Sequence, residues 1–330
     1  MQHSKTDTGR LILPDQLFLS AVLEGLRSSP QKTLPSRYFY DAKGSILFQQ
    51  IMALPEYYLT RAEMDIFRNK TAALIDALNM KQQLHYELVE LGPGDGTKTI
   101  HLLKGLLGNR FHLDYLPVDI SQSALNGLTA MLQKELPGLS VIPQQGDYFV
   151  KLKALKTNHR PKIILILGSN IGNLLDAEVS EFIAQLGDSL SPGDKILLGV
   201  DLVKAKEIVL PAYSDAQGIT AEFNLNLLDR INRELGADFD RRQFEHRASY
   251  EASEGIAKSY LISLVRQSVS IGSQVFHFAA GESIHTEISR KYNDEIISGI
   301  LQPTDISVAA KITDSQNLFA DYVLVKSGAD

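Results

Sequence analysis

The sequence predicts an α/β fold, in which a mostly parallel sheet carries an inserted α+β segment. Between residues 86 and 200, strand-like apolar runs alternate with helix-like segments, which is the pattern of consecutive βαβ units. After about residue 205 the pattern changes to one amphipathic helix and two long strand-like runs. The chain has 330 residues, 44% of them hydrophobic and 22% charged, so it has enough apolar surface for a core of this kind.

The alternating part begins with a strand and a glycine turn. Residues 86–91 are expected to form a buried strand that ends in Gly92-Pro93-Gly94-Asp95-Gly96, followed by a helix from about Thr97 to Leu107. Further strands are expected at 115–120, 139–144, 162–167 and 195–200, with helices after Ser121 and over 176–190. Since ligands of such sheets bind at the carboxyl ends of the strands, we expect the binding site there.

The segments outside this alternation have signals of their own. The capping-box spacing of Thr60 and Glu63 predicts one helix from Arg61 toward Leu78. Residues 206–290 are expected to be an insertion, with a helix over 220–235 and two long strands, 259–270 and 274–290, joined by a turn at 271–273. A helix over 293–301 and strands at 306–312 and 319–326 are expected to end the sheet with an antiparallel strand.

Polar features follow three successive strands. The glycine turn has the spacing G-x-G-x-G, which differs from the dinucleotide fingerprint G-x-G-x-x-G. Asp119 can accept hydrogen bonds from both hydroxyls of a ribose, and Asp147 can accept one from an adenine amino group. Each feature alone is also compatible with a tight turn or a helix N-cap, although Ser121 explains the cap near Asp119 better. Together they indicate a ligand that contains adenosine.

Lys98 follows the glycine turn at the start of the next helix. A cation at this place opposes the helix dipole unless an anion lies nearby. A carboxylate on the ligand would explain the lysine, and so would simple solvation at the surface.

Two further groups of side chains are candidates for a polar pocket. In the strand-like segment 282–291, alternation places Ser283, His285, Glu287 and Ser289 on one face and apolar residues on the other. This pattern suits a polar binding pocket and equally an ordinary half-exposed strand. Tyrosines gather upstream and can either close a pocket around an amine or carboxylate or pack beneath a helix; they are Tyr38, Tyr40, Tyr57 and Tyr58.

Composition excludes several classes of protein. The net charge of −6 argues against nucleic acid as the main partner, and the absence of cysteine excludes disulfides, zinc–cysteine sites and thiol nucleophiles. No HxxxH or HExxH motif or carboxylate cluster indicates a metal. The first sixteen residues lack the apolar region of a signal peptide, and no apolar run approaches the roughly 20 residues of a membrane span. We expect a cytoplasmic monomer that acts on a small molecule, without nucleic acid, membrane or metal.

Several stretches resemble one enzyme family closely. They are FYDAKGSILF at 39–48, LPEYYLTRAE at 54–63, ELGPGDGTKT at 90–99, GSNIGN at 168–173, AYSDAQGIT at 212–220 and TEISRKY at 286–292. These stretches are similar to the histidine Nα-methyltransferases of the ergothioneine pathway, a branch of the S-adenosylmethionine-dependent class I methyltransferases. The resemblance extends from about Leu34 to Val325.

The resemblance implies a Rossmann-like class I methyltransferase sheet with an inserted α+β substrate-binding domain. The S-adenosylmethionine-binding domain would comprise residues 15–62, 84–205 and 292–330, and the substrate-binding domain residues 63–83 and 206–291.

The resemblance also implies roles for individual residues. The positions that match cofactor-binding residues are Tyr40, Gly92, Gly94, Lys98, Asp119, Asp147 and Tyr148. Among these, Lys98 would face the methionine carboxylate, Asp119 the ribose and Asp147 the adenine. The positions that match substrate-binding residues are Tyr57, Asn173 and Tyr213 for the amino-acid carboxylate and amine, and Glu287 and Ser289 for the imidazole. Tyr40, Asn173 and the Gly168 carbonyl would lie at the reacting amine.

This sequence departs from the family pattern at two places. The glycine turn reads GPGDGTK where relatives often have a serine-rich version, and the strand at Lys258-Ser259-Tyr260 lies where relatives often place a methionine against the imidazole. The second change affects the part of the pocket that selects the side chain.

The activity implied is transfer of methyl groups from S-adenosylmethionine to the α-amine of L-histidine, up to three times, giving hercynine. Four alternatives stay open, the first of them within the same enzyme class. One is N-methylation of another amino acid or small amine. A second is a nicotinamide dehydrogenase, whose glycine fingerprint is absent. A non-catalytic sensor of adenosylmethionine or an amino acid is the third. Nucleic-acid methylation is the fourth, but the chain has GSNIGN where such enzymes carry an Asn/Asp-Pro-Pro-aromatic motif.

Overall fold

The computed structural model describes residues 14–328, and the N-terminal segment for which no signal peptide is expected lies mostly outside this range. The chain divides into two units. Unit 1 contains the described residues up to Glu56 together with Leu210–Ser249 and Lys258–Glu287. Unit 2 contains Tyr57–Val209, Tyr250–Ala257 and the described residues from Ile288 onward.

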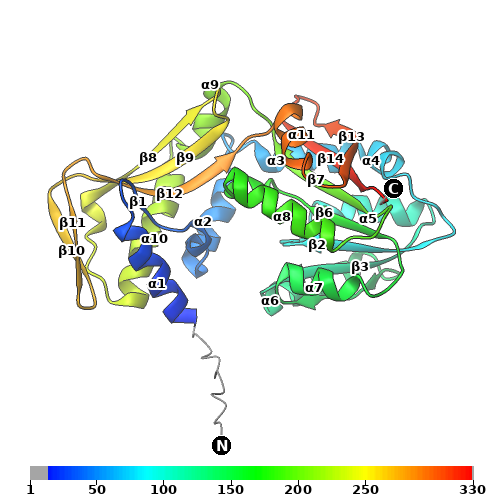
Figure 1. The fold of residues 1–330 in the computed structure, drawn as a ribbon, viewed down its shortest axis with the longest axis horizontal. Helices are drawn as coiled ribbons and strands as arrows, with labels where there is room; N and C mark the ends of the chain where they lie inside the picture. The colour runs from blue at the N-terminus through cyan, green and yellow to red at the C-terminus, as the bar shows by residue number, and fades with distance from the viewer. Residues whose placement is uncertain (1–13, 329–330) are drawn as a thin grey trace, which may run out of the picture. The chain divides into compact units, whose positions relative to one another are not determined.

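Unit 2 is built on one mixed sheet with the strand order β13-β14-β7-β6-β2-β3-β4, and β5 pairs with β3 (Figure 1). Its central strands are parallel: β2 (His85–Leu91), β3 (His112–Asp119), β6 (Lys162–Ile166) and β7 (Lys195–Asp201). The last strand, β14 (Phe319–Lys326), is antiparallel to both β7 and β13 (Ile306–Thr313). The structure therefore confirms the α/β prediction and the antiparallel closing strand.

The strand expected at 139–144 is split into two short strands, β4 (Ser140–Val141) and β5 (Gln144–Gln145). Between them lies Pro143, which has no backbone N–H to donate to the ladder. The chain pairs with β3 on both sides of this proline.

Helices cover both faces of the unit 2 sheet. On one face, α3 (Leu59–Asn69), α4 (Thr71–Leu78), α5 (Thr99–Gly108) and α6 (Gln122–Glu135) bury side chains in one apolar cluster. On the other face, α7 (Tyr148–Leu155), α8 (Asp176–Asp188) and α11 (Asp294–Leu301) bury theirs in a second cluster. Each central strand contributes side chains to both clusters, because neighbouring residues point to opposite faces of the sheet. In β2, Tyr86 and Leu88 belong to the first cluster, and Val89 and Leu91 belong to the second cluster. Such strands are buried on both faces, which is why β6 contains the continuous apolar run Ile163–Ile166.

The single helix expected from Arg61 toward Leu78 is two helices. α3 begins earlier, at Leu59, and the chain leaves helical geometry at Lys70 (φ −125°, ψ 19°) before α4. The capping-box interpretation of Thr60 and Glu63 is also wrong, because the N-cap residue is Tyr58 and the Glu63 carboxylate is engaged elsewhere.

Unit 1 contains α1 (Pro14–Arg27), α2 (Ala42–Ala53) and α10 (Ile219–Leu235), and α10 confirms the helix expected at 220–235 (Figure 1). A four-stranded sheet has the order β1-β12-β9-β8, formed by β1 (Lys32–Thr33), β12 (Ser283–Arg290), β9 (Ile256–Ser263) and β8 (Phe244–Glu251). The last residues of β12 and the facing ends of β8 and β9 are assigned to unit 2. Short helices complete the chain: η1 (Ser36–Phe39), η2 (Asn170–Asn173), α9 (Lys206–Val209), η3 (Leu210–Tyr213) and η4 (Arg241–Gln243).

The two long strands expected after residue 258 are four shorter ones. β10 (Gln267–Ile271) and β11 (Gln274–Phe278) form a separate antiparallel hairpin around the predicted turn, with Ile271 opposite Gln274. The chain leaves the larger sheet at residues 264–266 and again at 279–282, where Gly281 has φ +83°.

The unit boundaries differ from the expected domain boundaries. Residues 15–56 group with the inserted segment, because α2 packs on α10, whereas residues 63–83 group with the parallel sheet, because α3 and α4 pack against β14 and β13. The assignment of binding roles to the two parts stays a prediction. Within residues 14–328, no helix has the length and apolar character that a membrane crossing requires.

Candidate active site

The carboxyl ends of β2, β3 and β6 lie at one edge of the unit 2 sheet, because these strands are parallel. The turn after β2 depends on its glycines, since Gly92, Gly94 and Gly96 have φ of +65°, +61° and +72°. No described atom lies within 4 Å of the place where a Cβ on Gly94 would stand. The turn therefore exposes backbone to open space, as close approach of a ligand requires.

Tyr148 converges on this edge from the start of α7. A Cβ on Gly92 would lie 2.8 Å from the Tyr148 hydroxyl oxygen. Burial, together with the negative charges of Asp119 and Asp147, raises the pKa of Tyr148 to about 12. The structure thus brings together four residues that sequence similarity assigns to the cofactor: Gly92, Asp119, Asp147 and Tyr148.

The two acids are held by backbone contacts of their own. Asp119, which is partly buried, accepts a hydrogen bond from the Ser121 N–H at 2.8 Å, and Ser121 caps α6 as expected. Asp147 is exposed and caps α7 through the Val150 N–H at 3.1 Å. These contacts fix both carboxylates at the edge, where they can accept hydrogen bonds from hydroxyl or amino groups.

Lys98 lies just before α5 and forms an ion pair with Glu63, which is 1% exposed. The other oxygen of Glu63 accepts the Gly168 N–H at 2.8 Å. Burial disfavours the lysine's charge, but Glu63 outweighs this and raises the pKa of Lys98. One carboxylate therefore links the lysine after β2 to the loop after β6. The sequence analysis did not identify Glu63 as a site residue, because its spacing from Thr60 was interpreted as a helix capping box.

Two more acids are buried near this ion pair. Glu90 accepts from Thr99 and Tyr115 at 2.8 and 2.6 Å, yet burial raises its pKa to about 7. Burial and the charge of Glu63 raise the pKa of Asp321 well above its usual value, and neither of its oxygens has a hydrogen-bond partner among the described residues. Burial therefore disfavours the charged forms of Glu90 and Asp321, while the charge of Lys98 favours them.

The loop after β6 carries Gly168 and Asn173. Gly168 has φ +75°, and the next residue, Ser169, also adopts the left-handed region with φ +56°. Asn170, which sequence reasoning did not single out, lies near both Gly92 and Gly168: its side chain is 3.9 and 3.6 Å from where their Cβ atoms would stand. Asn173 ends η2 and is exposed.

In unit 1, Tyr40, Tyr213 and Glu287 lie close enough to interact electrostatically. Tyr40 is 46% exposed as a residue, but desolvation of its hydroxyl, then the charges of Glu287 and Tyr213, raise its pKa well above 10. Its ring packs edge-on against Phe48 and Phe223, with centroids 5.4 and 5.6 Å apart. The group combines aromatic faces with one carboxylate, which suits a ligand that carries both a cation and an N–H donor.

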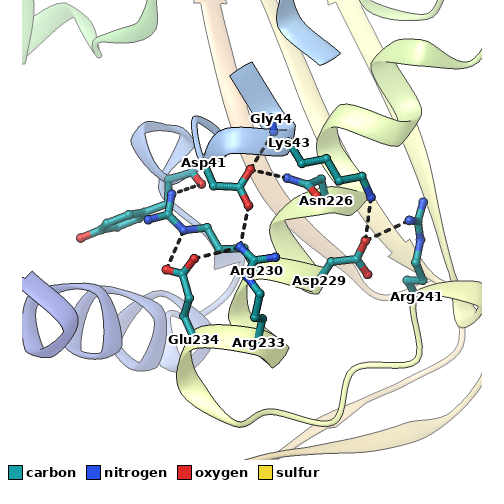
Figure 2. A network of polar contacts seen from close by, with 10 residues as sticks. Asp41, Lys43, Gly44, Asn226, Asp229, Arg230, Arg233, Glu234 and Arg241 are labelled. Carbon is teal, nitrogen blue, oxygen red and sulfur yellow. Dashed lines mark hydrogen bonds and ion pairs between the residues drawn. The ribbon is translucent and has the colours of Figure 1, made fainter. Parts of the chain in front are cut away.

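The Tyr40 segment is fixed to α10 by the polar network in Figure 2. Asp41 accepts from Gly44 N–H, Asn226 and Arg233 at 2.7, 2.9 and 2.6 Å. Burial disfavours ionisation of Asp41, but these hydrogen bonds outweigh it and hold its pKa below the usual value. On the other side of Tyr40, Arg230 donates to the Tyr38 carbonyl at 2.9 Å and to Glu234 at 2.9 Å. Tyr40 is therefore anchored on both sides along the chain.

The alternation predicted for the 282–291 segment is present in β12. Ile284, Thr286 and Ile288 are buried, while Ser283, His285 and Glu287 are partly exposed. Ser289 departs from the pattern, since it is 6% exposed and its hydroxyl accepts from the Lys291 ammonium at 2.8 Å. On β9, Ser259 is 1% exposed and its hydroxyl has no hydrogen-bond partner among the described residues.

The predicted amine and side-chain residues are distributed over the two units. Unit 1 carries Tyr40, Tyr213 and Glu287, and unit 2 carries Tyr57, Gly168, Asn173 and Ser289. Tyr57 is half-buried and immediately precedes Tyr58, which is buried. The structure brings Tyr40, Tyr213 and Glu287 together in unit 1, and the common role of the residues of the two units stays a prediction.

A parallel sheet closed by an antiparallel strand, with a glycine turn and two acids at successive strand ends, defines a class I, S-adenosylmethionine-dependent methyltransferase. Residues 18–326 match the family described as histidine-specific methyltransferase, SAM-dependent. The chain belongs to this family, as the resemblance indicates.

Curated relatives agree over most of the chain. The chain is 40% identical over 276 residues to a histidine N-alpha-methyltransferase of Mycolicibacterium smegmatis, covering 83% of this chain and 84% of that protein. It is 37% identical over 301 residues to a protein of the same name from Mycobacterium tuberculosis, covering 91% and 90%. It is also 28% identical over 300 residues to ergothioneine biosynthesis protein 1 of Schizosaccharomyces pombe, covering 89% of this chain and 39% of that protein.

Proposed function

We propose that this protein transfers methyl groups from S-adenosylmethionine to the α-amino group of L-histidine, up to three times, giving hercynine. The observation that carries the proposal is the family match over residues 18–326. The relatives named histidine N-alpha-methyltransferase support the same substrate and the same nitrogen.

The cofactor edge of unit 2 suits S-adenosylmethionine chemically. Asp119 would accept from the ribose hydroxyls and Asp147 from the adenine amino group, beside the Tyr148 hydroxyl. Gly92 and Gly94 would let the ligand approach the backbone. Lys98 would hold the methionine carboxylate, which would then share the lysine's charge with Glu63. When bound, the cofactor supplies an electrophilic sulfonium methyl group that needs no metal to activate it.

The protein's own task is to present a neutral amine with its lone pair aimed at that methyl group. The α-amine must lose its proton before each transfer, and hydrogen bonds from it to Asn173 and to the Gly168 carbonyl would orient it. Tyr57 and Tyr213 would bind the substrate carboxylate or amine. The face of Tyr40 can accommodate the positive charge that grows as the amine is methylated.

Glu287 is the residue that would select the side chain. A carboxylate in partly buried surroundings can accept the imidazole N–H, and Ser289 would bind the ring beside it. A side chain without such a donor would leave the carboxylate unpaired, which costs binding energy.

The test is to incubate the protein with S-adenosylmethionine and each of the twenty amino acids and to read mass gains of one, two and three methyl groups. Gains confined to histidine, and ending at three, would support the proposal. Gains on another amino acid, or none at all, would contradict it. Fragmentation spectra must place the methyl groups on the α-nitrogen, since methylation of the ring gives the same first mass.

Another amino acid or small amine is the second candidate, and Ser259 is the observation that favours it. The buried Ser259 hydroxyl has no hydrogen-bond partner among the described residues, and it lies in the segment 258–260, where the resemblance leads us to expect a methionine. A substrate with an additional polar group would satisfy this hydroxyl. The same screen distinguishes the two candidates.

We further propose that the protein is a cytoplasmic monomer that acts without nucleic acid, membrane or metal. The acidic net charge argues against nucleic acid as a partner, and the lack of cysteine is commoner in cytoplasmic than in secreted proteins. Light scattering of the purified protein tests the monomer, and activity after dialysis against a chelator tests metal independence. A dimer mass, or activity that returns only with a divalent ion, would contradict the respective part.

A further inference from the structure

Asp201, the last residue of β7, is the centre of a buried polar cluster in unit 2. It is 0% exposed, and its carboxylate accepts from Tyr58 Oη at 2.8 Å and from Lys291 Nζ at 2.8 Å. Lys204 forms a second ion pair with it. Its backbone N–H donates to Ser169 Oγ at 3.0 Å.

The cluster consists of buried charged groups. Lys291 and Lys204 both pair with the carboxylate of Asp201, and the side chains of Lys291 and Asp201 are 0% exposed. Burial lowers the pKa of Lys204 to about 8, an effect that Asp201 opposes and the charge of Lys291 assists. Desolvation makes such a cluster a weak source of stability, so its arrangement calls for another explanation.

Three of the partners of Asp201 come from separate parts of the chain, and each of the three lies within two residues of a residue with a proposed role at the substrate; they are Tyr58, Ser169 and Lys291. Tyr58 follows Tyr57 directly. Ser169 follows Gly168, and its hydroxyl is held by the Asp201 N–H.

The third partner reaches the end of β12. Lys291 Nζ donates to Ser289 Oγ at 2.8 Å while it pairs with Asp201. The Asp201 carbonyl also accepts from the Tyr292 N–H at 2.8 Å, so backbone and side chain both tie this segment to β7.

We propose that Asp201 is a positioning residue that holds the segments carrying Tyr57, Gly168 and Ser289 in the geometry that substrate binding requires. Asp201 acts through Tyr58, Ser169 and Lys291 and does not itself touch the substrate. The inference rests on the proposed function, because that function gives the three positioned residues their roles. Rigid placement matters, since a displacement of about 1 Å at a reacting group can cost on the order of 100-fold in rate.

The experiment removes the connections one at a time, with Tyr58→Phe, Ser169→Ala and Lys291→Met. Tyr58→Phe removes the hydrogen bonds to Asp201 and from Lys204, and Lys291→Met removes the contacts with Asp201 and Ser289. Each variant should raise the histidine KM about tenfold. Ser169→Ala should act mainly on kcat, because it loosens the loop that orients the amine. The dissociation constant for S-adenosylmethionine, measured by calorimetry, should stay within about twofold of wild type in all three variants.

Tyr322→Phe is the matched control. Tyr322 is a buried tyrosine of the same unit that donates to a carboxylate, Asp294, but it is bonded to none of the three segments. If Tyr58→Phe and Tyr322→Phe change the histidine KM equally, Asp201 has a purely structural role and the inference is overturned. Asp201→Asn keeps the backbone N–H that holds Ser169, so it should combine only the effects of Tyr58→Phe and Lys291→Met, and if it does not fold, the single-connection variants decide.

Failure of the proposed function would look different. If the wild-type protein methylates another amine, the same variants are measured with that amine. The positioning inference is then tested in the same way, by whether Tyr58→Phe raises the KM for that amine more than Tyr322→Phe does.

Discussion

The hydroxyl of Tyr148 lies directly against the backbone of Gly92, so that a Cβ on this glycine would be 2.8 Å from the hydroxyl oxygen. Gly92 also has φ +65°, a conformation that other residues adopt at a cost of about 1–2 kcal/mol. Two features therefore require glycine at position 92. One is the positive φ of its backbone, and the other is the nearby hydroxyl of Tyr148, which also lies close to Asp119 and Asp147.

Gly92→Ala should weaken S-adenosylmethionine binding about tenfold or more, because the added methyl group displaces the Tyr148 hydroxyl. Calorimetric titration measures this. Gly193→Ala is the control, since Gly193 has φ +88° with no described atom within 4 Å of its Cβ position and should lose stability without losing cofactor affinity.

A double variant separates the contact from the backbone strain. After Tyr148→Phe, the ring atom nearest the new methyl group is Cζ, at 3.9 Å, an ordinary contact. Gly92→Ala should therefore reduce affinity much less in the Tyr148→Phe background than in the wild type. Equal losses in the two backgrounds would show that the contact is irrelevant to binding.

Asp119→Ala should cost roughly 2–4 kcal/mol of S-adenosylmethionine binding, through the loss of two charge-assisted hydrogen bonds with some compensation by water. Because Asp119 also accepts from the Ser121 N–H at 2.8 Å, part of any effect can come from the turn itself. Asp119→Asn keeps that acceptor and should show an intermediate loss. An unchanged affinity in Asp119→Ala would place the ribose elsewhere.

The cofactor edge could be predicted from sequence because its signals are local. Apolar runs that are buried on both faces mark β2, β3 and β6, and the glycine turn, Asp119 and Asp147 follow strands directly. Parallel pairing then brings them to one edge without further information. Glu63 could not be found in this way, since Lys98 is 35 and Gly168 105 residues away along the chain.

The Asp201 cluster was unpredictable for the same reason. Tyr58 is 143 residues from Asp201, and Lys291 follows a strand whose alternation says nothing about the end of β7. The split of the long strands after residue 258 was also hidden, because apolar alternation continues through both parts. Periodicity describes the surroundings of each residue and does not show where the chain changes sheets.

His246 should make stability depend on pH in the acid range. Burial lowers its pKa to about 4, although the charge of Asp215 opposes this, and its Nε2 atom has no hydrogen-bond partner among the described residues. Above the unfolded-state pKa of about 6.5 both states are neutral; below it the unfolded chain binds the proton first. The free energy of unfolding should therefore fall as the pH falls from about 6.5 to 4, by roughly 3 kcal/mol from this residue.

Urea unfolding of wild type and His246→Gln at several pH values checks this. The variant should show a shallower decline between pH 6.5 and 4, while His159→Gln, at an exposed position, serves as the control. Parallel curves for wild type and His246→Gln would mean that the native protein protonates His246 as readily as the unfolded chain does.

Glu287 tests how histidine is selected. It lies on the partly exposed face of β12, and its charge helps to raise the pKa of Tyr40. Glu287→Ala should raise the histidine KM about ten- to a hundredfold, because an imidazole N–H then lacks its acceptor at a cost of roughly 1–3 kcal/mol. The enlarged, less polar pocket should also begin to accept phenylalanine or tryptophan.

Cofactor binding provides the internal control for Glu287→Ala. The cofactor edge is formed by the strand ends of unit 2, so the calorimetric affinity for S-adenosylmethionine should not change. Glu287→Gln keeps the size and one acceptor oxygen but loses the charge, and should fall between wild type and Glu287→Ala. The measurement is kcat/KM for histidine, phenylalanine and tryptophan in the three proteins. If kcat/KM for histidine is unchanged in the variants, Glu287 does not contact the substrate, and histidine is no longer the favoured substrate. A loss of kcat/KM for histidine alone would identify Glu287 as the acceptor of the imidazole N–H.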